Sequence, residues 1–254
     1  MNDLRGKRGL VMGLANRQSI AHGCAAAFRA AGAELALTYT GAKTRPHVEP
    51  LAEALGCDLL FDCDVAQPGR MAEVFDVLDD AWGQIDFCLH SIAFCPREDL
   101  HGPVIECSRE GFSTAMAISC HSFIEMARLA RPRMSQGRAL LTVSYYGAEK
   151  VVPHYNIMGP VKAALEACVR YMASDLGQDG IRVNALSPGP IQTRAASGIA
   201  HFDQLIELAK RDAPQHQLVS VEDVGALAAF LAGDGARHIT GAVIPVDGGF
   251  HAVT

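Results

Sequence analysis

The chain has 254 residues, of which 49% are hydrophobic and 20% charged, and its formal net charge is -6. This composition is typical of a globular chain that buries its own core, and it excludes the disordered and fibrous classes. The negative charge argues against nucleic-acid binding, which needs a basic face for the phosphates. No apolar run reaches the roughly 18 residues of a membrane span, so we expect no membrane association.

Seven short apolar runs bounded by Gly, Asp or Pro are predicted strands, at residues 9–12, 34–38, 58–61, 86–90, 139–143, 182–186 and 243–246. The amphipathic stretches between them are predicted helices, at residues 19–31, 47–55, 67–82, 111–134, 156–176, 202–210 and 221–231. Their alternation predicts an α/β fold with a seven-stranded, doubly wound parallel sheet of Rossmann type. We expect one domain over residues 1–254, with residues 188–214 forming a substrate lid within it.

The loop after the first strand combines a glycine with the start of a helix. Gly13 allows a tight turn, and Ser19 is suited both to cap the helix and to reach a phosphate at its N-terminus. The G-x-G-x-x-G pattern is absent, so a glycine turn before a capped helix is an equal interpretation of this stretch.

Three further strand ends carry candidate cofactor contacts. Asp64 follows the third strand, where it would meet an adenine edge or cap a loop. Ser91 and Ile92 follow the fourth strand, where small residues would let a ribose approach the backbone; a buried strand end is the alternative. Thr193 closes the Pro- and Gly-rich turn after the sixth strand, which lies on the ligand-binding rim of an open sheet or is a plain turn.

Tyr155 and Lys162 are seven residues apart, about two helical turns, so they are predicted to project from one helix face. A lysine beside a tyrosine suits acid or oxyanion chemistry, although an amphipathic surface has the same pattern. Tyr146 and Lys150 form a competing Tyr-x3-Lys pair, the pattern of carbonyl and alcohol dehydrogenases. Pro153 stands just behind that pair, where a long catalytic helix should continue.

The eight cysteines form no C-x-x-C pair and share no spacing with histidine that suits zinc. We therefore expect no metal, reduced thiols and a cytoplasmic location.

Together these segments resemble the short-chain dehydrogenase/reductase superfamily over nearly the whole chain, and within it the bacterial enoyl-acyl-carrier-protein reductases. The specific marks are the G-x5-S-I-A loop, Asp64-Val65, the Ser-Ile-Ala-Phe run at 91–94, and tyrosines 145 and 155 with a lysine seven residues beyond the second. Ordinary members of the superfamily use Tyr-x3-Lys, so the seven-residue spacing favours the enoyl reductases.

The resemblance implies hydride transfer from NADH to the β-carbon of a trans-2-enoyl thioester on acyl carrier protein or CoA, within a homotetramer. Tyr155 would stabilise the enolate oxygen, Lys162 would hold the nicotinamide ribose, and Tyr145 would assist. Cys95, Tyr145 and Tyr155 are the expected substrate contacts. The expected cofactor contacts are Gly13, Ser19, Ile20, Asp64, Val65, Ser91, Ile92, Lys162, Ile191 and Thr193. The alternatives are a short-chain carbonyl reductase and a non-catalytic NAD(P)-binding scaffold.

Three departures qualify this picture. The second strand ends without the acid that usually binds the 2′-hydroxyl of NAD, and Lys43 and Arg45 lie just beyond; we expect NADH, with NADPH as the alternative. Pro160 replaces an aliphatic residue in the predicted catalytic helix. The helix at 202–210 begins without the basic residues of the family, so we expect Lys210 and Arg211 to attract an acidic carrier protein.

Overall fold

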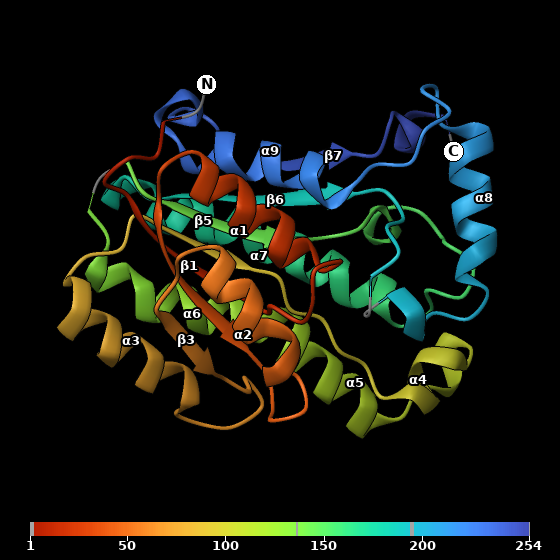
Figure 1. Ribbon diagram of the computed structural model, residues 1–254. Helices are drawn as coiled ribbons and strands as arrows, with labels where there is room; N and C mark the ends of the chain where they lie inside the picture. Colours follow the sequence, from red (N-terminus) through yellow and green to blue (C-terminus); the bar gives the residue numbers. More distant parts are fainter. Residues whose placement is uncertain (1–2, 136, 194–195, 254) are drawn as a thin grey trace.

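The computed structural model describes residues 3–135, 137–193 and 196–253. Seven parallel strands form one sheet in the order β3-β2-β1-β4-β5-β6-β7 (Figure 1). The strands are β1 (Arg8–Met12), β2 (Glu34–Tyr39), β3 (Leu59–Asp62), β4 (Phe87–His90), β5 (Ala139–Val143), β6 (Arg182–Pro188) and β7 (Val243–Val246). The predicted sheet is confirmed, and each strand lies within two residues of its predicted bounds.

The α-helices of the described residues are α1 (Ile20–Ala30), α2 (Arg45–Ala54), α3 (Arg70–Trp82), α4 (Arg97–His101), α5 (Arg109–Met116), α6 (Ser122–Ala130), α7 (Met158–Leu176), α8 (Phe202–Asp212) and α9 (Val221–Ala232). The short helix α4 was not predicted. Within the same ranges, no helix is both long enough and apolar enough to cross a membrane.

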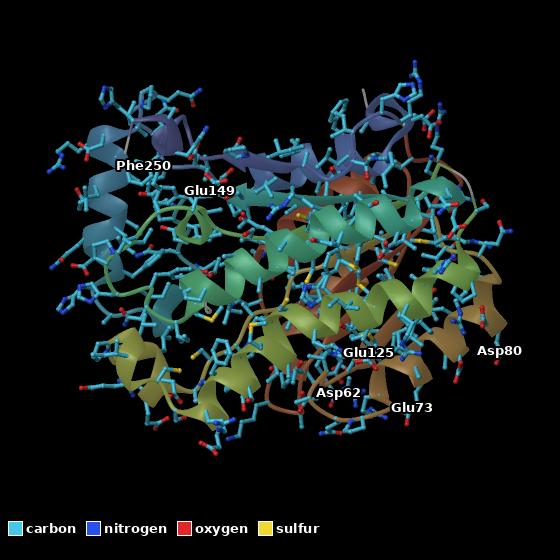
Figure 2. All side chains as sticks on the ribbon, turned by 180° about the vertical axis from the view of Figure 1, so that it is seen from behind. Asp62, Glu73, Asp80, Glu125, Glu149 and Phe250 are labelled. Carbon is cyan, nitrogen blue, oxygen red and sulfur yellow. The ribbon has the colours of Figure 1, made fainter. Side chains whose placement is uncertain are left out.

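Alternating side chains of the strands feed two separate cores. On β1, Val11 packs among residues of α1, α2 and α9, whereas Leu10 and Met12 pack among residues of α3, α6 and α7. Successive residues of a strand point to opposite faces of the sheet, so helices cover both faces. Figure 2 shows α6 and α7 across one face, and α8 standing at one end beside Phe250.

The predicted helix at 111–134 is wrong as a single element. It begins earlier, at Arg109, because the Ser108 hydroxyl accepts the Gly111 amide hydrogen at 2.9 Å. A π-helical segment, η2 (Ala117–His121), then separates α5 from α6. The Ser122 hydroxyl donates to the Ile118 carbonyl at 2.6 Å, and such a bond competes with the regular helical ladder.

The predicted start of the next helix is also wrong. Asn156 has a φ of 45°, in the left-handed region, so α7 begins only at Met158. Tyr155 therefore precedes the helix and does not project from its face. Pro160 lies in the first turn of α7, where backbone N–H groups have no partner within the helix. This position accounts for a proline near the start of a long helix.

Helices α1 and α9 cross with their backbones in direct contact. A Cβ added to Gly23 would lie 2.2 Å from the Val221 carbonyl oxygen, and one added to Gly225 would lie 2.4 Å from the Gly23 carbonyl oxygen. Real Cβ atoms do not approach oxygen so closely, so both positions require glycine. The crossing fixes α1, whose N-terminus faces the ligand-binding end of the sheet, against the C-terminal part of the chain.

Candidate active site

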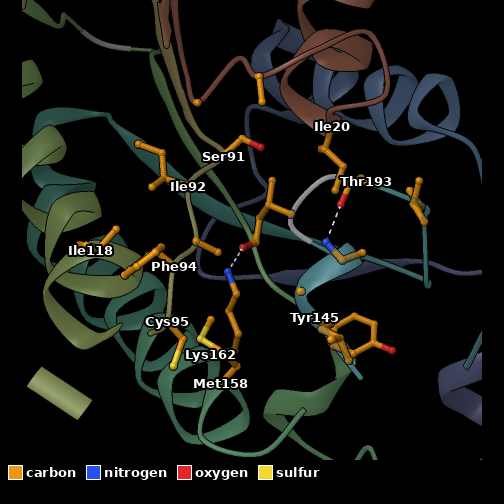
Figure 3. A pocket seen from close by; sticks show the side chains of 18 of the residues that line it. Ile20, Ser91, Ile92, Phe94, Cys95, Ile118, Tyr145, Met158, Lys162 and Thr193 are labelled. Atoms are coloured by element: carbon orange, nitrogen blue, oxygen red, sulfur yellow. Dashed lines mark hydrogen bonds between the residues drawn. The ribbon is translucent and has the colours of Figure 1, made fainter. Parts of the chain in front are cut away.

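A cavity of about 890 Å³ opens at the carboxyl ends of β1 and β4, where the order of the strands reverses. This reversal is the usual ligand position in an open α/β sheet, and the volume is in the range of small-molecule sites. Figure 3 shows Ile20 and Ser91 toward one end of the cavity, and Cys95 and Met158 toward the other.

The predicted site residues converge on this cavity, with one exception. Those that line it are Gly13, Ile20, Asp64, Val65, Ser91, Ile92, Cys95, Tyr145, Tyr155, Lys162, Ile191 and Thr193. The exception is Ser19, which is buried at the start of α1. Its hydroxyl accepts the His22 amide hydrogen at 3.3 Å and donates to the Asn16 carbonyl at 2.7 Å. Ser19 therefore caps α1, which is one of the two roles predicted for it.

The turn after β1 forms a backbone cradle that fits a dinucleotide phosphate. Gly13 has a φ of 96°, and a Cβ there would lie 2.2 Å from the Ser91 carbonyl oxygen. Glycine is therefore required for β1 and β4 to bring their loops together. Ile20, the first residue of α1, lines the cavity, which places the positive end of the helix dipole at this cradle.

The far end of the cradle is formed by the loops after β2 and β3. Asp64 lines the cavity and also caps its own loop, where its carboxylate accepts the Ala66 amide hydrogen at 3.0 Å. Thr44 lines the cavity and directly precedes α2. The next residue, Arg45, is paired with Glu49, with 2.5 Å between Nε and Oε1. This guanidinium, at the start of α2, is thus engaged by a carboxylate.

Lys162 is the one cation among the described residues that line the cavity. It projects from α7 and is 4% exposed, and its Nζ donates to the Val143 carbonyl at 2.7 Å (Figure 3). Burial lowers the pKa of Lys162 to about 8, because the ammonium is removed from water. An ammonium has three N–H donors, so the bond to Val143 leaves donors for a ligand.

The two predicted tyrosines lie together beside this lysine. The rings of Tyr145 and Tyr155 meet edge to face, and burial raises the pKa of both hydroxyls above the usual range. Both groups therefore keep their protons at neutral pH and act as hydrogen-bond donors. A Cβ added to Gly147 would lie 2.5 Å from the Tyr155 ring, so glycine makes room for that ring.

Buried polar groups behind the cavity were not recognised in the sequence. The Ser144 hydroxyl donates to Glu166 Oε1 at 2.5 Å, and burial raises the pKa of Glu166. His90 Nε2 lies 2.6 Å from the Ser122 hydroxyl, and burial lowers the pKa of His90 to about 3. The available signal was the placement of Glu166 one helical turn after Lys162.

Further apolar residues line the cavity, and none of them was named as a single contact because apolar side chains at these positions look like core. They come from the β4 loop, α4, η2, α7, the segment before α8 and the first residue of α8, and they are Phe94, Leu100, Ile118, Met158, Ile199 and Phe202. The last two lie in the predicted lid at 188–214. Within the described ranges, no cluster of three or more His, Cys, Asp or Glu side chains is arranged to hold a metal.

The competing Tyr-x3-Lys pair lies outside this arrangement. Tyr146 begins a short 3-10 turn, η4 (Tyr146–Ala148), and its ring packs against Phe250 with 5.5 Å between centroids. Lys150 is exposed, and neither residue of the pair lines the cavity. The two are not held on one helix as carbonyl reductase chemistry requires.

A doubly wound sheet with a tyrosine and a lysine buried at its switch point is the architecture of nicotinamide-dependent oxidoreductases. A family model described as "Enoyl-(Acyl carrier protein) reductase" matches residues 13–251. Enoyl-[acyl-carrier-protein] reductase [NADH] 1 of Rhizobium meliloti (strain 1021) is 48% identical over 98% of this chain and 92% of its own length.

Two solved structures have the same fold over almost their whole length. The enzyme from Anaplasma phagocytophilum in complex with NAD is 46% identical, with a TM-score of 0.94 over 98% of this chain and 95% of that one. The Bacillus cereus enzyme with NADP+ and an indole naphthyridinone is 42% identical, with a TM-score of 0.96 over 100% of both chains. The chain belongs to the enoyl-(acyl carrier protein) reductase family.

Proposed function

We propose that the protein uses NADH to reduce the carbon–carbon double bond of trans-2-enoyl thioesters in fatty-acid synthesis. The observation that carries this proposal is the cavity itself, where Tyr155 and Lys162 face a wall that is otherwise largely apolar. An acyl chain needs such a wall, and a developing oxyanion needs such donors. The relative from Rhizobium meliloti is named as an enoyl-[acyl-carrier-protein] reductase that uses NADH, which supports the same activity.

The cofactor is proposed to occupy the end of the cavity near α1. The turn at Gly13 and the N-terminus of α1 suit the diphosphate. Lys162 is proposed to hold the nicotinamide ribose, and Ser19 contributes by capping α1. Bound NADH supplies the hydride. The remaining contacts proposed along the cavity are Ile20, Asp64, Val65, Ser91, Ile92, Ile191 and Thr193.

The chemical role proposed for Tyr155 is to stabilise charge on the substrate. Addition of a hydride at the β-carbon leaves negative charge on the thioester oxygen, and the Tyr155 hydroxyl donates a hydrogen bond to that oxygen. The raised pKa of Tyr155 keeps this donor protonated, and Tyr145 holds the ring by edge-to-face contact. Tyr145 and Cys95 contact the acyl group. The α-carbon of the enolate then takes a proton from solvent with the assistance of Tyr145, which gives the saturated thioester.

A direct assay separates this function from its alternatives. Purified protein is mixed with NADH and crotonyl-CoA, and oxidation of NADH is followed by absorbance. Turnover of the enoyl thioester is expected, with none for simple ketones. Reduction of ketones alone would favour a carbonyl reductase, and binding of NADH without turnover of either would favour a non-catalytic scaffold.

The lid and the assembly are proposed on separate observations. Ile199 and Phe202, from the predicted lid at 188–214, line the cavity, which supports a role for that segment in covering the substrate; residues 194 and 195 lie outside the described residues. Phe112, Ile124 and Tyr171 are exposed apolar side chains on α5, α6 and α7, and they support a homotetramer. Light scattering tests this state, with an expected mass near four times 27.1 kDa.

The carrier and the location complete the proposal. Lys210 and Arg211 lie in the last turn of α8, within the predicted lid at 188–214, where an acidic carrier protein would deliver its acyl chain. Lys210 is paired with Glu207 at 2.9 Å, and Arg211 with Asp212 at 2.6 Å, in exposed ion pairs that a stronger acidic partner can replace. A cytoplasmic location is proposed from the pattern of cysteine use.

A further inference from the structure

A buried carboxylate lies behind the lysine of the active site. Glu166 is 4% exposed and follows Lys162 by four residues on α7, a spacing that makes two side chains neighbours on one helix face. Its Oε1 accepts the hydrogen of the Ser144 hydroxyl at 2.5 Å. A buried acid with a defined hydrogen bond is costly to keep, so its effect on the site needs an explanation.

Glu166 and Lys162 attach the end of β5 to two successive turns of α7. Lys162 donates to the Val143 carbonyl at 2.7 Å (Figure 3), and Ser144, the next residue, donates to Glu166. Tyr145 follows directly and lines the cavity. The bond to Ser144 therefore restrains the backbone from which Tyr145 projects.

Glu166 is also the charged group that favours the ammonium form of Lys162. Burial lowers the pKa of Lys162 to about 8, and Cys120 and Glu166 act against this loss. Burial raises the pKa of Cys120 to about 12, so it is an uncharged thiol near pH 8. His90 also interacts with Lys162, but burial lowers its pKa to about 3 and it is equally uncharged. The negative charge that supports Lys162 near pH 8 is therefore that of Glu166.

The surroundings of Glu166 favour its ionised form. Burial raises its pKa, and the exposed Glu149 adds to that effect. The Ser144 hydroxyl, Arg170 and Lys162 act in the opposite direction. A glutamate ordinarily ionises near pH 4.3, far below the range in which Lys162 changes its charge, so we infer a carboxylate there.

The same carboxylate affects Tyr155 in a useful direction. Burial raises the pKa of the Tyr155 hydroxyl, and Tyr145 and Glu166 add to the effect. A nearby negative charge disfavours a tyrosinate and favours an ammonium. One carboxylate thus helps to keep both hydrogen-bond donors of the site protonated.

We propose that Glu166 is a positioning residue of this site, whose carboxylate keeps Lys162 protonated and, through Ser144, holds the end of β5 that leads into Tyr145. The inference rests on the proposed use of Lys162 in cofactor binding. An ammonium has three N–H donors, of which one is taken by Val143, and its charge attracts the cofactor diphosphate. A neutral amine has fewer donors and no such attraction.

The charge of Lys162 is measured directly on the protein without NADH. Lysine is labelled with carbon-13 at Cε, and the NMR signal of Lys162, assigned by its loss in Lys162→Met, is followed from about pH 6 to 10. Wild type should titrate near pH 8. Glu166→Gln still accepts from Ser144 but carries no charge, so its midpoint should fall by about one pH unit. A midpoint that stays near 8 would overturn the proposal.

Two further variants separate the charge from the packing. Glu166→Asp keeps the carboxylate but draws it back from Ser144 by one methylene, and its midpoint should remain near that of wild type. Asp175→Asn makes the same change of charge at an exposed residue near the C-terminal end of α7, and it should leave the midpoint unchanged. If Glu166→Asp shifts as far as Glu166→Gln, the packing is the cause and the proposed role of the charge is wrong.

The effect on the cofactor is measured separately, by fluorescence titration with NADH. A midpoint one unit lower leaves the Kd of Glu166→Gln near the wild-type value at about pH 6 and raises it about fivefold at about pH 8, where less of Lys162 is protonated. An equal rise at both pH values would indicate a structural defect and contradict the proposed role in binding. Protein that binds no NADH, or does not reduce crotonyl-CoA, would contradict the proposed function, while the titration of Lys162 would still decide the role of Glu166.

Discussion

The rings of Tyr145 and Tyr155 meet edge to face, with 4.9 Å between their centroids and 65° between their planes. Tyr155 lies in a turn before α7, so its position depends on packing against this neighbour and not on a helix. In the proposed reaction the two hydroxyls have separate roles: Tyr155 acts on the reacting oxygen, while Tyr145 positions that residue and the acyl group.

Tyr155→Phe removes the donor and leaves the packing of the ring. We expect kcat for crotonyl-CoA to fall about 100-fold or more, the usual loss for one oxyanion donor, with the Kd for NADH nearly unchanged. Steady-state kinetics and fluorescence titration measure the two quantities. Tyr146→Phe is the matched control and should remain near wild type, because that ring packs on Phe250 outside the cavity. A near-normal kcat for Tyr155→Phe would refute the assignment.

Lys162 should make NADH binding depend on pH. Its pKa is lowered to about 8 from an ordinary value of 10.5, so the free enzyme loses the ammonium as pH rises through about 8. Only the protonated form donates three hydrogen bonds, and we therefore expect the Kd for NADH to increase above that pH. Titrations between about pH 6.5 and 9.5 test this, since both limits lie well away from the pKa.

Two variants check the assignment of that pH dependence. Lys162→Arg keeps its charge over the whole range, because guanidinium does not lose its proton there, so the inflection should vanish. Lys162→Met should bind NADH weakly at every pH. An inflection that persists in either variant would show that another group is responsible.

Selectivity for NADH should depend in part on the pair between Arg45 and Glu49. Glu49→Gln frees the guanidinium at the start of α2, close to the end of the cavity lined by Thr44. We expect kcat/KM with NADPH to rise by up to about fivefold, the value of an exposed ion pair, with little change for NADH. Glu53→Gln, a change at an exposed acid on the same helix, is the control and should alter kcat/KM with neither NADPH nor NADH. A wild-type preference for NADPH would contradict the prediction outright.

Lys210 and Arg211 should govern association with an acyl carrier protein. The double variant Lys210→Ala, Arg211→Ala is expected to reduce the slope of kcat/KM against ionic strength, because rim charges act chiefly on the association rate. Activity with enoyl-CoA should change little. Arg237→Ala, at the opposite end of the sheet near Lys7 and Asp234, is the matched control. An unchanged slope in the double variant would point to a different carrier or docking surface.

Pro160 should be nearly neutral for stability. Pro160→Ala restores an N–H in the first turn of α7, where no helical carbonyl accepts it, so the free energy of unfolding should change by about 1 kcal/mol or less. Ala164→Pro, one turn farther into the helix, should cost about 3 kcal/mol. Chemical denaturation measures both, and a gain of about 3 kcal/mol for Pro160→Ala would mean that α7 begins earlier than Met158.

The sheet was predictable because each buried parallel strand is a short apolar run in the sequence, bounded by glycine, aspartate or proline. The break at η2 was not, since it depends on the hydroxyls of Ser119 and Ser122 meeting Phe94 and His90, which only the folded chain brings near. The position of Tyr155 was not predicted correctly for a similar reason. Its seven-residue spacing from Lys162 suits one helix face, but Asn156 has a left-handed backbone, so Tyr155 lies in a turn before the helix.

Within the site, residues with distinctive chemistry could be predicted and the others could not. Lys162 and Tyr155 were singled out because their seven-residue spacing, together with the neighbouring motifs, resembles the enoyl reductases; the spacing alone also suits an amphipathic surface. Ser19 could be read two ways, and its observed hydrogen bonds support the cap. Ile118 and Leu100 were missed because an apolar side chain has the same appearance in a sequence whether it lines a cavity or fills a core.

The glycine crossing of α1 and α9 has a consequence for the order in which the protein is made. Gly23 and Gly225 lie near opposite ends of the chain, yet each backbone rests directly on the other helix. During synthesis the turn at Gly13 and α1 emerge early. The face of α1 that carries Gly23 has no partner, however, until nearly the whole chain has left the ribosome. The turn at Gly13, where we propose that the cofactor diphosphate binds, is thus among the first parts to be synthesised and among the last to be fixed in place, so a nascent chain lacking α9 should not bind NADH.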